Sequence, residues 1–134
     1  MTPGEIYRFN YLWGHEAKKG WTGSRKIRRV CLAMQIGGYL YLFPITSRQP
    51  RTEDGDDRLH VEIPEAEKRR INLQLNKPSF LVLDDYNRVR SDRLYDFESL
   101  TPTGTLSLDF MAEVARLFQA AIRDKRAIHG LTRP

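Results

Sequence analysis

Residues 29–46, RVCLAMQIGGYLYLFPIT, place a pair of glycines between two apolar runs. A two-residue glycine turn between β-prone runs is a strong signal for a β-hairpin. The sequence therefore predicts two antiparallel strands, at 29–36 and 39–46, joined at Gly37-Gly38. Pro44 has no backbone N–H to donate, so we expect the second strand to near its end there or to run along an edge.

Other short runs predict further strands on both sides of this hairpin. Residues 5–13, EIYRFNYLW, alternate well and predict an aromatic-rich first strand. The polar stretch 47–58 is typical of an exposed loop, and Pro64 is expected to open a short helical turn. The remaining predicted strands are 59–63, 79–86 and a weaker, edge-like one at 88–97.

The clearest helical pattern lies near the C-terminus, at about residues 107–127. Ser107 is the expected N-cap, and Asp109 suits the positive end of the helix dipole. Basic residues follow in the last turn before Gly130, which suits the other end. The apolar residues form one stripe, to which we assign packing only: Phe110, Met111, Val114, Leu117, Phe118, Ala121 and Ile122.

These elements predict a mainly β protein with a C-terminal helix. About five short strands with hairpin connections favour a small, strongly bent antiparallel barrel, formed by about residues 3–97. The helix would plug or flank this barrel. A length of 134 residues favours a single domain that spans 1–134.

The charge of the chain is both unbalanced and patterned. Lys plus Arg number 22 and Asp plus Glu number 17, which gives a net charge of +5. Basic side chains cluster at 18–29 and 68–70, whereas EDGDD at 53–57 is acidic. This pattern predicts a positive face and an anionic partner.

Several functional classes are disfavoured. Cys31 is the only cysteine, so neither an intramolecular disulfide nor a cysteine metal site is possible. His15, His60 and His129 lack ligand spacing, and EDGDD lacks the positions of a calcium loop, so we expect no metal and no cofactor. No apolar stretch approaches bilayer length and no signal-peptide pattern opens the chain, so we expect a cytoplasmic protein without a membrane partner.

Residue types suited to metal-free RNA cleavage occur at the ends of predicted strands. The reaction needs a base for the 2′-OH, an acid for the 5′-oxygen, and cations or hydrogen-bond donors for the phosphorane. Each candidate named below also has a purely structural interpretation. In the order given, these are a solvated loop pair with the neighbouring glutamate, an exposed strand start, a turn cap and a strand end. The candidates are His15, Arg28, Thr46 with Ser47, and Asp84 with Asp85.

The order of several motifs resembles the MazF/PemK/Kid family of toxin ribonucleases from toxin–antitoxin pairs. The motifs are PGEIYRFNY from residue 3, GHE at 14–16, the basic residue and apolar strand at 28–34, PITS at 44–47, HVEI at 60–63 and LDDYNRVRSDRL at 83–94. The similarity covers about residues 3–95. It implies an SH3-like barrel of the MazF/Kid/CcdB kind, a homodimer with an RNA groove along the subunit interface, and metal-independent endoribonuclease activity on single-stranded RNA or mRNA.

The resemblance also implies roles for single residues. His15 matches the loop histidine of the Kid branch, and Arg28 matches the arginine of an Arg-Pro pair that contacts the scissile phosphate. Thr46 matches the active-site threonine, and Asp84 matches the carboxylate proposed as base. The partner implied by analogy is a cognate antitoxin, as an acidic, partly disordered segment over the basic groove.

Three departures from the family pattern stand out. Arg29 replaces the proline of the Arg-Pro pair, so either arginine is a candidate for the phosphate contact. The loop before that pair is longer by several residues. Val82 stands where the Kid branch has a second catalytic arginine, so Arg88 or His15 would have to supply the general acid.

Under this hypothesis residues 14–30 form a mobile, glycine-hinged basic loop that closes over the phosphate backbone. Trp21 is placed either to stack on a base or to anchor the loop on the barrel. The expected RNA-binding residues are Lys18, Lys19, Trp21, Arg25, Lys26, Arg29, Ser47, Arg48 and Arg88.

Two alternatives use the same fold without cleavage. One is a protein that binds nucleic acid or another protein, because a fold does not guarantee chemistry. The other is an adaptor that recognises a peptide through Tyr7, Tyr11 and Trp13.

Overall fold

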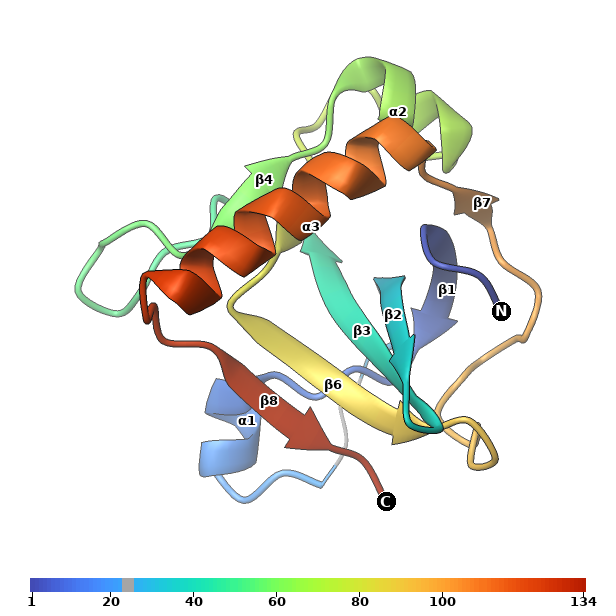
Figure 1. Cartoon of the computed structure of the whole chain (residues 1–134), viewed down its shortest axis with the longest axis vertical. Coiled ribbons are helices and arrows are strands. Elements are labelled where there is room, and N and C mark those ends of the chain that lie inside the picture. The colour runs from blue at the N-terminus through green and yellow to red at the C-terminus, as the bar shows by residue number, and fades with distance from the viewer. Residues whose placement is uncertain (23–25) are drawn as a thin grey trace.

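The computed structural model describes residues 1–22 and 26–134. Within these residues it contains eight strands and three helices (Figure 1). In chain order they are β1 (Glu5–Phe9), α1 (Gly14–Lys18), β2 (Arg28–Ile36), β3 (Tyr39–Thr46), β4 (His60–Glu62), α2 (Glu65–Arg70), β5 (Phe80–Val82), β6 (Asp85–Arg90), β7 (Gly104–Thr105), α3 (Leu108–Arg123) and β8 (His129–Thr132).

The central hairpin is confirmed. β2 and β3 pair antiparallel from Ile36 opposite Tyr39 to Val30 opposite Pro44. Gly37 and Gly38 join them with φ angles of 58° and 79°, which a two-residue hairpin turn of this hand requires and which glycine adopts without strain.

Strand β3 is the branch point of the sheet. One of its edges pairs with β2, while the other pairs first with β6, from Tyr39 to Leu42, and then with β5, at Ile45 and Thr46. Pro44 lies where this second edge changes partner. The strand does near its end at the proline, since β3 stops at Thr46, but the alternative that it runs along an edge is wrong, because β3 has neighbours on both sides.

The described strands form an open, mainly antiparallel sheet in the order β4-β5-β3-β2-β1-β7, with β6 joined to β3 and β8 joined to β6. β8 runs parallel to β6. The predicted edge strand at 88–97 is corrected in two ways: the strand spans Asp85–Arg90, and it lies between β3 and β8. The expected strand at 79–86 is divided between β5 and the start of β6.

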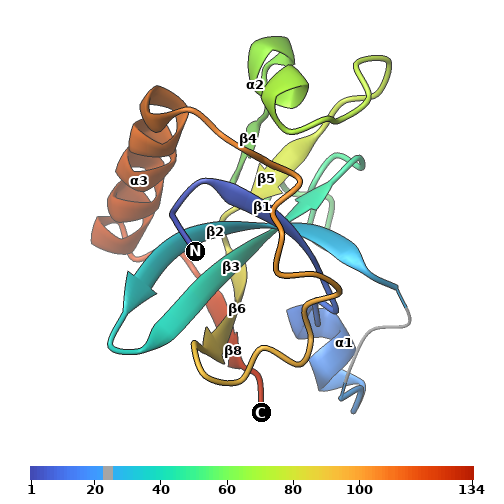
Figure 2. The same cartoon turned by 90° about the vertical axis from the view of Figure 1, so that its right-hand side faces the viewer.

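The two faces of the sheet carry separate cores, because neighbouring strand residues point to opposite sides. Ile6, Cys31 and Phe43 belong to the core beneath α3. Tyr7, Val30 and Leu42 belong to the other core, which also holds Trp13. Figure 2 shows α3 and α1 on opposite sides of the sheet.

Burial of aromatic residues excludes the peptide-adaptor interpretation. Tyr7, Tyr11 and Trp13 expose only 1%, 0% and 7% of their surface. These side chains are core residues and present no aromatic surface to a peptide.

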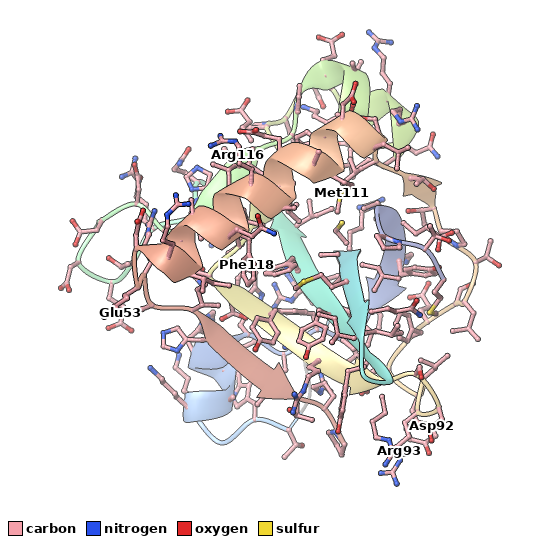
Figure 3. All side chains as sticks on the ribbon, in the orientation of Figure 1. Glu53, Asp92, Arg93, Met111, Arg116 and Phe118 are labelled. Atoms are coloured by element: carbon pink, nitrogen blue, oxygen red, sulfur yellow. The ribbon has the colours of Figure 1, made fainter. Side chains whose placement is uncertain are left out.

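Helix α3 covers part of the sheet. Met111 and Phe118 lie on its sheet-facing side and Arg116 on the other (Figure 3). The Ser107 hydroxyl caps the helix by accepting a 3.1 Å hydrogen bond from the Phe110 amide, as predicted. The helix ends at Arg123, earlier than expected, and Gly130 lies in β8 rather than at the helix end.

No helix in the described part of the chain has the length and apolar character needed to cross a lipid bilayer.

Candidate functional site

The segment that follows β1 is tied firmly to β6. The Asn87 side chain accepts a hydrogen bond from the Leu12 amide at 2.9 Å and donates one to the Leu12 carbonyl at 2.7 Å. The Gly14 amide donates to Asp85 Oδ2 at 3.0 Å, and a Cβ atom at position 14 would meet that oxygen at 2.9 Å. The stretch expected to begin a loop at Gly14 instead forms helix α1.

Trp13 is a buried residue whose ring packs against three side chains of the candidate site. The Arg28 and Arg58 guanidinium carbons lie 5.8 and 5.5 Å from the centre of its ring. The His15 ring lies nearly parallel to it, with 6.0 Å between the centres. Arg28 and Arg58 line two different hollows, so the buried Trp13 ring lies close to one guanidinium from each.

The first concave surface, here called the histidine hollow, has a volume of about 580 Å³. It brings together five of the candidate residues named from the sequence, which come from α1 and its C-terminal end and from the start of β6 with the turn before it. Its lining residues are Gly14, His15, Lys18, Lys19, Arg51, Thr52, Glu53, Arg58, Asp84, Asp85, Ala127 and His129.

Asp84, the predicted base, is engaged by an arginine. Arg58 Nε lies 3.1 Å from both Asp84 carboxylate oxygens, and its Nη2 donates to Oδ1 at 2.7 Å. Burial lowers the pKa of Arg58, but its hydrogen bonds to Asp84 and the charges of Asp84 and Asp85 outweigh this and raise the pKa overall. The carboxylate thus holds a charged guanidinium at the hollow.

Asp85 lies beneath the hollow as a buried carboxylate. Its Oδ1 accepts a hydrogen bond from the Tyr11 hydroxyl, its Oδ2 accepts one from the Gly14 amide, and Arg58 Nη2 lies 3.7 Å away. Burial raises the pKa of Asp85, although these donors partly oppose the shift. Burial likewise raises the pKa of Tyr11 well above its ordinary value, so the phenol remains a donor.

The second concave surface, here called the cationic hollow, has a volume of about 460 Å³. The start of β2 meets the end of β3 here, because the two strands are antiparallel neighbours. Four basic side chains and no acidic one belong to its described lining, which is Arg8, Lys26, Ile27, Arg28, Arg29, Ile45, Thr46, Ser47, Leu73 and Ser79.

Arg28 is the basic residue of the cationic hollow that forms an ion pair with α1. Its Nη2 lies 3.3 Å from Glu16 Oε2, and Glu16 also accepts a hydrogen bond from the Trp13 amide. Its Nε is buried and has no hydrogen-bond partner among the described residues.

The predicted site residues thus fall into two adjoining hollows rather than one cleft. His15, Lys18, Lys19 and Asp84 line the histidine hollow, whereas Arg28, Arg29, Thr46, Ser47 and Lys26 line the cationic hollow.

Other predicted residues lie outside both hollows. Arg88 stacks 4.3 Å from the centre of the Tyr39 ring and donates to the Thr132 hydroxyl. Trp21 and Arg48 are exposed and line neither hollow. Val82 is fully buried in the core, and Arg25 lies outside the described residues.

Arg58 and His129 are the site residues that the sequence interpretation missed. Arg58 directly precedes the predicted strand at 59–63, so a basic residue at a strand start was the available signal. His129 offered no such signal, because only the pairing of β8 with β6 brings it opposite Asp85.

Neither a protein-family model nor a curated protein matches the chain. Among the described side chains, no group of three or more His, Cys, Asp or Glu residues is arranged to hold a metal ion.

Proposed function

We propose that this protein is a metal-independent endoribonuclease that cleaves single-stranded RNA and acts as the growth-inhibiting toxin of a toxin–antitoxin pair. One observation carries the proposal: a cationic hollow with no carboxylate in its described lining adjoins a second hollow that holds imidazole and guanidinium groups. An RNA strand that reaches both hollows would be bound in the first and cut in the second.

The cationic hollow supplies the grip on RNA. Arg28, Arg29 and Lys26 offer positive charge to backbone phosphates, whose neutralisation releases counterions and contributes most of the affinity. Thr46 and Ser47 add hydroxyl donors for phosphate oxygens. The Arg28 side chain lines this hollow and is 30% exposed, so its guanidinium is open to a phosphate.

The histidine hollow supplies the chemistry. Arg58 offers a guanidinium to the phosphorane, where negative charge accumulates in the transition state. His15 is exposed on the same surface and exchanges a proton with the reacting oxygens. Asp84 orients Arg58 rather than serving as the base, because both of its oxygens accept hydrogen bonds from that arginine.

We also propose an SH3-like barrel, a homodimeric assembly and an antitoxin partner for this protein. The three-way pairing of β3 and the wrapped core on the α1 side are compatible with an SH3-like barrel. We propose a homodimer in the cytoplasm that pairs with an acidic antitoxin segment over the basic hollow. Sedimentation at micromolar concentration should show a dimer, and a monomer alone would contradict this assembly.

Cleavage is tested with purified protein, single-stranded RNA and excess EDTA. Wild-type protein should release fragments with 5′-hydroxyl ends, and Arg28→Ala and Thr46→Ala should weaken RNA binding and lower the cleavage rate at subsaturating RNA by about 10-fold. Arg116→Gln is the charge-matched control, since Arg116 pairs with Glu113 on the exposed side of α3. Induced expression should arrest growth with wild-type protein and with the control alone.

A non-catalytic RNA-binding protein is the second candidate. The observation that favours it is the engagement of Asp84, the family's proposed base, by Arg58. RNA binding without fragments at any pH would support this candidate and contradict the first.

A further inference from the structure

We propose that His129 is a second catalytic imidazole, which works with His15 as the acid–base pair of RNA cleavage. This inference rests on the proposed function and deepens it, because it names the partner that completes proton transfer. The sequence interpretation assigned no role to His129, which lies beyond the region of family resemblance.

The two histidines come from distant parts of the chain and meet at one hollow. His129 opens β8, where its amide donates to the Asp84 carbonyl at 2.8 Å and its backbone stands opposite Asp85. His15 is the second residue of α1. A Cβ atom placed on Gly14 would lie 3.8 Å from the His129 Cβ, so the start of α1 touches the start of β8.

Both imidazoles are accessible to a substrate. His15 and His129 are exposed residues, and both line the histidine hollow. The other charged groups of this hollow are Lys18, Lys19, Arg51, Glu53, Arg58 and the Asp84-Asp85 pair. Arg58 faces the same space, so one phosphate can contact a guanidinium while its flanking oxygens meet the two rings.

The third histidine does not compete for this role. His60 Nδ1 lies 2.6 Å from the Arg58 carbonyl, and its Nε2 lies 3.2 Å from the Gln49 side chain. It lines neither hollow.

The reaction balances without a metal or a further reagent. One imidazole, neutral, removes the proton from the ribose 2′-OH as that oxygen bonds to phosphorus. The other, as imidazolium, donates a proton to the 5′-oxygen as the P–O5′ bond breaks. The products are a 2′,3′-cyclic phosphate and a 5′-hydroxyl, and Arg58 balances the charge on the phosphorane.

The first test measures kcat, KM and fragment identity for wild type, His15→Gln, His129→Gln and Arg126→Gln, with EDTA, from about pH 5 to about pH 9. Each histidine variant should lose about 100-fold to 10,000-fold in kcat with little change in KM, and each should lose one limb of the bell-shaped pH profile. Arg126→Gln removes an exposed basic side chain near His129 and should behave as wild type. Circular dichroism checks that all variants are folded.

The second test uses RNA with sulfur in place of the bridging 5′-oxygen. A thiolate leaves without protonation, so the variant that lacks the acid should recover most of its rate, while the variant that lacks the base should not. If the sulfur-substituted RNA restores the cleavage rate of only one histidine variant, the result supports His15 and His129 as an acid–base pair. Rescue of both or of neither overturns the assignment.

The outcomes separate this inference from the proposed function. Cleavage by wild type together with an unchanged rate and pH profile for His129→Gln overturns the inference and leaves the endoribonuclease proposal standing. No cleavage by wild type overturns both.

Discussion

Asp85 shows how a single residue supports the candidate site. Its carboxylate is 3% exposed overall and receives hydrogen bonds from Tyr11 and Gly14. A buried carboxylate is costly unless donors surround it. The hydrogen bond from Gly14 that stabilises the buried carboxylate also fixes the start of α1, the helix that carries His15.

Tyr11→Phe should lower the free energy of unfolding by about 1 to 3 kcal/mol, because it removes a donor from a buried carboxylate. Urea denaturation measures the change. Tyr95→Phe is the matched control, since the Tyr95 side chain is 78% exposed. Equal stability of the two variants would show that the Tyr11 hydroxyl contributes nothing.

The raised pKa of Asp85 predicts a pH dependence of stability. Above the unfolded value of about 3.9, the unfolded chain has released a proton that the folded state still holds. Stability therefore falls as pH rises from there through the raised pKa. Asp85→Asn cannot titrate, so it should not show this loss. As pH rises, the free energy of unfolding of wild type should therefore fall relative to that of Asp85→Asn. A difference independent of pH would contradict the raised pKa.

At the scale of elements, the N-terminus of α3 is fastened to α2. The Ser107 amide and hydroxyl both donate to the Glu67 carboxylate at 2.8 Å, while the same hydroxyl caps α3. Gly104, in β7, passes so close to α2 that a Cβ atom there would meet the Arg70 carbonyl oxygen at 2.5 Å. Thus α2 determines where α3 begins over the sheet.

Ser107→Ala should cost about 0.5 to 2 kcal/mol of stability through loss of the cap. A double-mutant cycle with Glu67→Ala should give a coupling energy of at least about 0.5 kcal/mol. The exposed pair Glu113 and Arg116 of α3 provides the control cycle, with an expected coupling below about 0.5 kcal/mol. Similar coupling in the two cycles would contradict a special role for Glu67.

At the scale of the whole molecule, Arg133 joins parts of the chain that are far apart. Its Nη1 donates to the Asn10 carbonyl at 2.5 Å and to Asn87 Oδ1 at 3.2 Å, and its Nη2 lies 3.4 Å from Asp96. The residue is 4% exposed. It clamps the strand that carries His129 to the segment that leads into α1.

Arg133→Met should destabilise the protein by at least about 2 kcal/mol, because it leaves buried acceptors unpaired. The amides of Leu12 and Trp13 should also exchange with deuterium faster than in wild type. Arg93→Met serves as control, because Arg93 projects into solvent from the turn after β6 (Figure 3). Unchanged exchange at both amides would contradict the clamp.

Local patterns in the chain were enough to predict the central hairpin, the Ser107 cap and the sheet-facing stripe of α3, because each depends on residues close together in sequence. Ile122 is the exception in that stripe, since it is 56% exposed and packs outside the core. The sequence at Pro44 and at 88–97 wrongly indicated edge strands. Whether a strand is an edge depends on which strands pair with it, and the neighbours β5, β6 and β8 come from distant segments of the chain.

The candidate site depended still more on distant contacts. Its arginine and aspartate, Arg58 and Asp84, stand 26 residues apart, and His15 and His129 come from opposite ends of the chain. Composition and motifs named the kinds of side chain that RNA chemistry needs. Which of them share a hollow followed from sheet pairing and the burial of Trp13, since long-range packing brings together side chains that no local pattern relates.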